Sequence, residues 1–235
     1  MSAILEVRGL EKAFGGIQAL NGPSFDVPEG AIVGLIGPNG SGKSTLFSCV
    51  TGTEAIDGGA VRFKGERIDG LPPFRIARKG IGRTFQLNRL FPQLTVLENM
   101  LAVVGPHKAA GAERRARELI DFVTLGRVTH ELAANLSYGQ SKLLEFIRAL
   151  MLEPTLVMLD EPAAGVNPTL LEKLVGYIRE LRERGVTFLI VEHNMNMVMN
   201  LCDGVVVLDY GEKIAEGPPR SIQENERVIE AYFGR

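Results

Sequence analysis

Nine consecutive residues, Gly37 to Thr45, have the pattern of a loop that binds phosphate groups. They read Gly-Pro-Asn-Gly-Ser-Gly-Lys-Ser-Thr, after an apolar run that indicates a strand and before apolar positions that indicate a helix. Glycines lack a Cβ, so backbone N–H groups can approach an anion closely, and the start of a helix adds partial positive charge there. The Lys43 ammonium can reach terminal phosphates, and the Ser44 hydroxyl can ligate Mg²⁺. The sequence therefore predicts a nucleoside triphosphate site formed by Gly37, Asn39, Gly40, Ser41, Gly42, Lys43, Ser44 and Thr45.

Two acidic residues, Asp160 and Glu161, end a second apolar run, Leu156 to Leu159. Four consecutive apolar residues indicate a strand buried on both faces of a parallel sheet, and ligands gather at the carboxyl ends of such strands. Asp160 is therefore expected to hold Mg²⁺, directly or through water, and Glu161 to orient a water molecule. The alternative is that the two acids only cap the following helix. A further predicted strand ends in Glu192 and His193, which places these residues at the same edge of the sheet.

A second helix start follows residues 136–140, which read Leu-Ser-Tyr-Gly-Gln. One interpretation is an ordinary helix cap by Asn135 or Ser137. The other is a second anion site, built from Ser137, the amide of Gly139 and the helix dipole. One nucleotide cannot easily contact two separate helix starts of one chain, whereas in a symmetric dimer each chain can cover its partner's nucleotide.

Phe14 stands just before Gly15, near a predicted loop. An exposed aromatic ring at this place can stack on a purine base. Ordinary packing at the edge of a sheet explains the residue equally well, and both interpretations stay open.

The elements that must position these residues alternate between strands and helices in both flanks of the chain. Short strands are expected at residues 4–10, 24–27 and 60–63, and they predict a small antiparallel sheet beside the phosphate loop. Residues 88–152 are predicted to be helical. The strand–helix–strand order of the flanks favours a parallel sheet, so the predicted fold class is α/β. A last helix to about Phe233 is expected, with Ser221 and Glu224 as its capping box.

Composition limits the classes of function. The net charge of −2 argues against a nucleic-acid binder that depends on counterion release. No apolar run approaches the ~20 residues of a membrane span, and Glu6 and Arg8 interrupt the N-terminal stretch before a signal-peptide core could form. Cys49 and Cys202 offer no disulfide framework and are expected to be buried free thiols. We therefore expect a soluble, cytosolic protein.

Together the motifs resemble the ATP-binding subunit of ATP-binding cassette (ABC) transporters over essentially the whole chain. They occur in the family's order: Walker A at Gly37–Thr45, the Q-loop at Gln86, the signature at residues 136–140, Walker B with its catalytic glutamate at Leu156–Glu161, the D-loop at residues 164–167 and the switch histidine at His193. Phe14 stands where the family has the aromatic residue that stacks on adenine. This agreement favours the functional interpretation of Phe14 and His193.

The resemblance is strongest to the branched-chain amino acid importer branch. Residues 83–86 (Arg-Thr-Phe-Gln), 163–168 (Ala-Ala-Gly-Val-Asn-Pro) and 228–232 (Val-Ile-Glu-Ala-Tyr) look like that branch. Three features depart from it: a short stretch between Gln86 and the signature, Asn194 where aspartate is usual, and Ser141-Lys142 where Gln and Arg are usual. An importer of urea or another substrate, and a soluble ABC ATPase without a transport role, therefore remain alternatives.

The resemblance implies a P-loop NTPase fold with a RecA-like core, an antiparallel edge sheet (residues 1–87 and 153–235) and a helical subdomain at about 88–152. It further implies that two chains sandwich two ATP molecules. The roles carried over are catalysis by Glu161, His193 and Gln86, Mg²⁺ ligation by Ser44, Gln86 and Asp160, and ATP contacts across the dimer by Ser137, Gly139 and Gln140.

The implied partners are a second ABC ATPase subunit, identical or not, and integral membrane permease subunits. A solute-binding protein would act indirectly. The implied location is the cytoplasm, at the inner face of the cell membrane.

Overall fold

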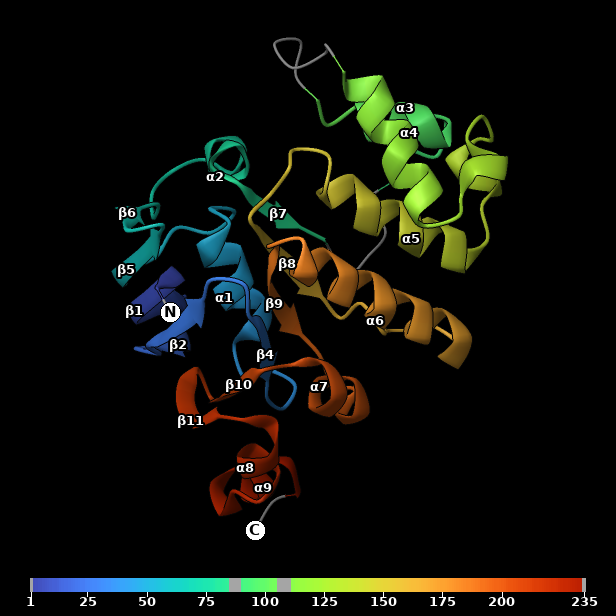
Figure 1. Cartoon of the computed structure of the whole chain (residues 1–235). Helices are drawn as coiled ribbons and strands as arrows, with labels where there is room; N and C mark the ends of the chain where they lie inside the picture. Colours follow the sequence, from blue (N-terminus) through green and yellow to red (C-terminus); the bar gives the residue numbers. More distant parts are fainter. Residues whose placement is uncertain (1, 85–89, 105–110, 234–235) are drawn as a thin grey trace.

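The computed structural model describes residues 2–84, 90–104 and 111–233, and Figure 1 shows their arrangement. A six-stranded sheet with the order β11-β10-β4-β9-β8-β7 runs through the centre. Its strands are β4 (Ile32–Ile36), β7 (Ile81–Arg83), β8 (Leu156–Asp160), β9 (Thr187–Val191), β10 (Gly204–Asp209) and β11 (Glu212–Gly217). Neighbours from β10 to β7 are parallel, and β11 runs antiparallel to β10. Every residue of β4, β8 and β9 is buried, which for β8 confirms the prediction of a strand buried on both faces.

A second, antiparallel sheet lies beside the first and has the order β2-β1-β5-β6, with β3 also paired to β1 (Figure 1). Its strands are β1 (Ala3–Phe14), β2 (Ile17–Asn21), β3 (Phe25–Pro28), β5 (Gly58–Phe63) and β6 (Glu66–Arg67). The prediction that the first strand ends at residue 10 is wrong. Polar residues beyond that point pair with β2 (Glu11 with Asn21, Lys12 with Leu20), so the strand continues to the turn at Gly15. Helix α1 (Lys43–Val50) contributes Leu46 and Phe47 to a core shared with both sheets.

Helices α3 (Val96–Leu101), α4 (Ala112–Phe122) and α5 (Tyr138–Ala149), with the short 3-10 helices η2 (Gly126–Val128) and η3 (Ala133–Asn135), form a group at one end of the molecule (Figure 1). Thr95 and Glu98 form a capping box at the start of α3. The apolar faces of α3, α4 and α5 join one core cluster with β8 and β9. This cluster attaches the helices to the central sheet.

The remaining helices are α2 (Pro73–Lys79), α6 (Pro168–Glu183), α7 (Met195–Leu201), α8 (Pro219–Gln223) and α9 (Glu226–Phe233). The expectation of one last helix capped by Ser221 and Glu224 is wrong. Ser221 lies inside α8 and its hydroxyl donates to the Pro218 carbonyl at 2.8 Å. The Asn225 side chain accepts hydrogen bonds from the N–H groups of Arg227 and Val228, so a separate helix begins there.

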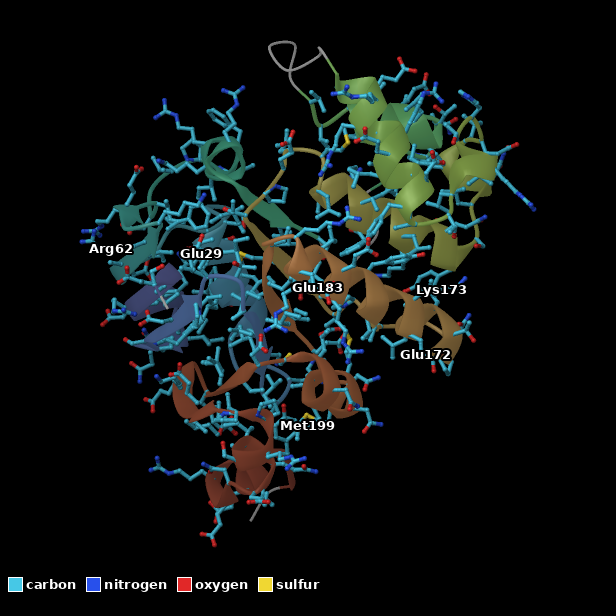
Figure 2. All side chains as sticks on the ribbon, in the orientation of Figure 1. Glu29, Arg62, Glu172, Lys173, Glu183 and Met199 are labelled. Carbon is cyan, nitrogen blue, oxygen red and sulfur yellow. The ribbon has the colours of Figure 1, made fainter. Side chains whose placement is uncertain are left out.

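The outer face of α6 is polar, and Figure 2 shows Glu172, Lys173 and Glu183 along this helix. All three side chains are exposed. None of the helices in the described ranges has the length and apolar character needed to cross a membrane. Cys49 and Cys202 are free, the first buried and the second half-buried.

Candidate active site

The phosphate loop passes from β4 to α1 between two other strands, and glycine is required where it touches them. A Cβ at Gly37 would lie 2.0 Å from the carbonyl oxygen of Leu208, at the end of β10. A Cβ at Gly42 would lie 2.5 Å from the carbonyl oxygen of Ala19 on β2. Both residues also have positive φ angles, 152° and 101°. Neighbouring strands therefore hold the loop in a conformation that side chains at these positions would prevent.

Lys43 is the buried cation of this loop. Its ammonium donates hydrogen bonds to the carbonyl oxygens of Gly37 and Pro38 at 2.8 Å and to the Ser41 hydroxyl at 3.2 Å. Burial lowers the pKa of Lys43, and the nearby carboxylates Glu161 and Asp160 oppose this shift. A positive charge is thus fixed inside a loop whose residues Asn39, Gly40 and Ser44 are exposed.

An open pocket of about 400 Å³ lies over the loop. It brings together residues that are far apart in the sequence: Ile17 to Ala19, Asn39 to Thr45, Glu161, His193 and Tyr210. Phe14 is 45% exposed at the end of β1, directly before the turn at Gly15 and Gly16 that leads to the pocket residue Ile17. The Lys12 ammonium lies 5.1 Å from the centre of its ring. Glu161 and His193 therefore meet the phosphate loop in one pocket, as predicted.

Asp160 and Glu161 sit at the carboxyl end of β8. Asp160 is 5% exposed; its Oδ2 lies 3.6 Å from the Arg83 guanidinium, whereas its Oδ1 has no hydrogen-bond partner among the described residues. Burial raises the pKa of Asp160, and the Arg83 charge counteracts this shift. A buried carboxylate oxygen without a protein partner suits a cation or a bound water, which supports the expected Mg²⁺ role.

His193 follows β9, and its Nε2 lies 2.8 Å from Oε1 of Glu161. The pairing of β8 with β9 produces this contact, because Asp160 is in register with Val191 and the residues after both strands emerge at one edge. The N–H of Glu161 also donates to the Val191 carbonyl at 2.9 Å. Glu161 has a φ of 48°, a left-handed conformation that turns the chain sharply after the strand. Gln86, which was assigned to catalysis and to Mg²⁺, lies outside the described residues.

Ser137 caps α5. Its hydroxyl accepts the N–H of Gln140 at 3.3 Å, and the Gln140 side chain accepts the Ser137 N–H at 2.8 Å, which is a capping box. Asn135 lies in η3 instead and is not the cap. Ser137, Gly139 and Gln140 line a different pocket, of about 430 Å³, which shares no lining residue with the pocket over the phosphate loop. Within one chain the two predicted anion sites are therefore separate.

Two further residues touch this machinery, and the sequence pattern assigned no role to either of them. The Tyr138 hydroxyl donates to the Ala164 carbonyl at 2.7 Å and so joins the start of α5 to the segment after Glu161. The buried Glu192 accepts hydrogen bonds from three backbone N–H groups. An exposed tyrosine and an acid next to a histidine are not distinctive in a sequence, so only the position of Glu192 at a strand end could have signalled it.

Comparison with known proteins shows the family of this chain. Residues 20–164 match the family model described as ABC transporter. The chain belongs to the ABC transporter family. It is an ATP-binding cassette of that ATPase family, and its residues 212–235 match a second model, described as Branched-chain amino acid ATP-binding cassette transporter.

Relatives of this cassette cover nearly its full length. It is 43% identical to the high-affinity branched-chain amino acid transport ATP-binding protein BraF of Pseudomonas aeruginosa, over 98% of each chain. The solved ADP conformation of MJ1267, an ATP-binding cassette of an ABC transporter, superposes with a TM-score of 0.91 at 35% identity and 100% coverage of both chains. The dimeric structure of MJ0796, a bacterial ABC transporter cassette, gives a TM-score of 0.83 at 26% identity, covering 92% of this chain and 99% of that one.

Proposed function

We propose that this cassette hydrolyses ATP to power an ABC importer of branched-chain amino acids or a related small polar solute. The observation that carries the hydrolytic part is the 2.8 Å contact between Glu161 and His193 in the pocket over the Lys43 loop. The printed function of the BraF relative and the match of residues 212–235 support the substrate class.

In this proposal the loop amides, Lys43 and Thr45 hold the phosphates of ATP. Glu161 accepts a proton from the attacking water, and His193 keeps the Glu161 carboxylate in place and contacts the γ-phosphate. Positioning and charge stabilisation supply most of the acceleration in such phosphoryl transfers. The Phe14 ring is proposed to stack on the adenine.

Mg²⁺ fits the same site through Asp160, whose Oδ1 is buried without a partner among the described residues. We assign its ligation to Asp160, Ser44 and Gln86. When bound, the ion would neutralise negative charge on the phosphate oxygens.

The active form is proposed to be a dimer of this chain or of two related chains. Ser137, Gly139 and Gln140 cannot serve the phosphate loop of their own chain, because they line a separate pocket. In a symmetric arrangement each signature would cover the partner's ATP. The dimeric MJ0796 cassette is a precedent for two cassettes associating.

Permease subunits are the proposed membrane partners, and they would hold this chain at the inner face of the cell membrane. A solute-binding protein would act on it only indirectly, through the permease. The docking segment is residues 87–97, of which 90–97 are described. The alternative to docking is that Leu90 and Phe91 only pack the helical group. Leu90 does pack against the helical core, so this alternative explains it, whereas Phe91 is 50% exposed. The buried Asn99 side chain bonds both the N–H and the carbonyl of Phe91 and so holds this residue at the surface.

Cysteines placed one at a time from Asn88 to Gln93 should crosslink to a permease subunit, with yields that change when ATP is added. Cysteines placed in β1 or β5 serve as the comparison. Crosslinks found only in those two strands would contradict the docking segment.

Glu161→Gln tests the hydrolytic role directly. The amide keeps the shape of the side chain but cannot accept the proton, so turnover should fall about 100-fold or more. ATP binding should persist, and the ATP-bound dimer should accumulate. Lys43→Ala, as the comparison variant, should lose tight ATP binding. Turnover of Glu161→Gln at the wild-type rate would show that another group is the base.

A further inference from the structure

Glu192 is a buried carboxylate that connects the two segments on which Glu161 and His193 stand. It follows β9 directly, and only 3% of its surface is exposed. Its Oε1 accepts the N–H of Ala163 at 2.7 Å, two residues beyond Glu161. Its Oε2 accepts the N–H groups of His193 and Asn194, both at 3.0 Å. One side chain therefore fixes the backbone on both sides of the Glu161–His193 contact.

The three partners select the ionised form of this side chain. All are N–H donors, which bond a carboxylate on both oxygens but offer no acceptor for a carboxylic acid proton. Hydrogen bonds from N–H groups to a charged oxygen are stronger than neutral ones, and these three partly offset the loss of water, although burial still leaves the pKa of Glu192 raised. A neutral amide cannot accept on both sides, so replacing one oxygen by NH₂ leaves at least one of these N–H groups without its acceptor.

The segment that Glu192 holds needs support. Glu161 has a φ of 48°, and a non-glycine residue in this left-handed region is strained and persists only where its surroundings hold it. The turn after Glu161 is closed by the hydrogen bond from the Ala164 N–H to the Glu161 carbonyl at 3.1 Å. Glu192 bonds the residue in the middle of this turn, Ala163.

We propose that Glu192 is a positioning residue for ATP hydrolysis, which holds Glu161 and His193 at the separation that activates the attacking water. This inference rests on the proposed function of the site. Among the described residues, the Glu192 carboxylate accepts hydrogen bonds from the backbone of the two loops and none from the Lys43 loop. Its loss should therefore impair the chemical step and spare nucleotide binding.

The test compares Glu192→Gln with the wild-type chain in steady-state ATP hydrolysis and in equilibrium binding of a fluorescent ATP analogue. Small misplacements of catalytic groups commonly cost about 10- to 100-fold in rate. We expect kcat to fall by about that factor, with the dissociation constant changed less than about twofold. Glu192→Asp, which is too short to reach both loops, should give the same split if Glu192→Gln folds poorly.

Asp203→Asn is the matched control. Asp203 also accepts a backbone N–H, that of Ile32 at 2.8 Å, but at the start of β4, the opposite edge of the same sheet. Asp203→Asn removes the same charge and also weakens the 2.9 Å ion pair of Asp203 with Arg182, so a loss caused by disturbing this sheet in general would appear in both variants. Its kcat should stay within about twofold of wild type.

A double substitution decides whether Glu192 acts through the catalytic pair. In a His193→Ala background the pair is already broken, so Glu192→Gln should lower the residual kcat by less than about twofold more. Three results would each overturn the inference. The first is that Glu192→Gln lowers kcat by the same factor with and without His193→Ala. The others are that Glu192→Gln alone leaves kcat unchanged, or that it weakens ATP affinity while kcat stays normal. A wild-type chain that bound ATP without hydrolysing it would instead contradict the proposed function.

Discussion

Adding a methyl group at Gly42 should damage the protein more than adding one at other glycines. Gly42 has a φ of 101°, and the added Cβ would lie 2.5 Å from the Ala19 carbonyl oxygen. An alanine in the left-handed conformation costs about 1–2 kcal/mol, and the overpacking against β2 costs another ~1–3 kcal/mol. Gly42→Ala should therefore lower the free energy of unfolding by about 2–5 kcal/mol.

Two matched substitutions separate backbone strain from the close contact. Gly40 has a φ of 81°, but no atom of the described residues lies within 4 Å of an added Cβ, so Gly40→Ala should cost only about 1–2 kcal/mol. Gly176, inside α6, has neither a positive φ nor an atom of the described residues within 4 Å of an added Cβ. Gly176→Ala should therefore raise the free energy of unfolding by about 0.5–1 kcal/mol. Urea unfolding followed by circular dichroism measures all three. If Gly42→Ala cost no more than Gly40→Ala, the reasoning about the contact with β2 would be refuted.

Three further predictions concern other parts of the fold. Tyr138→Phe removes the hydrogen bond to the Ala164 carbonyl, which is worth about 1 kcal/mol. The rate of amide hydrogen exchange at residues 163–166 should therefore rise about fivefold. An unchanged exchange rate would argue against this bond. Burial raises the pKa of Cys49 to about 11 and that of Cys202 to about 12, so both thiols stay protonated at pH 8. They should therefore react with iodoacetamide only after unfolding. Fast labelling of the native chain, detected by mass spectrometry, would contradict this. Asn225→Ala should cost about 1 kcal/mol of stability in urea unfolding, because it removes the cap of α9, whereas an equal cost for Ser221→Ala would favour a single capped helix.

The sequence was sufficient to locate the catalytic edge of the sheet. Apolar residues identified β4, β8 and β9, although β9 begins with the polar Thr187, and the acidic residues at the ends of β8 and β9 marked where those two strands end. Because parallel strands end at one edge, the sequence placed Glu161 and His193 at the same edge, whereas the pairing of β8 with β9 that brings them into contact was seen only in the structure.

Local patterns failed where tertiary contacts decide. Strand β1 extends through polar residues because β2 pairs with it, and its partner cannot be read from its own sequence. Near the C-terminus the sequence pattern favoured Ser221 as a helix cap. In the structure the Asn225 side chain caps α9, and the Ser221 hydroxyl bonds the Pro218 carbonyl. The contacts of Glu192 join segments 29 residues apart, and a sequence shows no periodicity for such a bond.

The separation of the two pockets makes a mixing experiment the most direct test of the central claim, ATP hydrolysis at a site shared by two chains. Lys43→Ala spoils the phosphate loop of its own chain, and Ser137→Arg spoils the signature that its chain offers to the partner. Each homodimer should be inactive, because both of its sites contain a defect. In a mixed dimer both defects can fall on one site and leave the other intact, so mixing the two variants should restore ATP turnover. Inactive mixed dimers, once shown to form, would contradict the shared site.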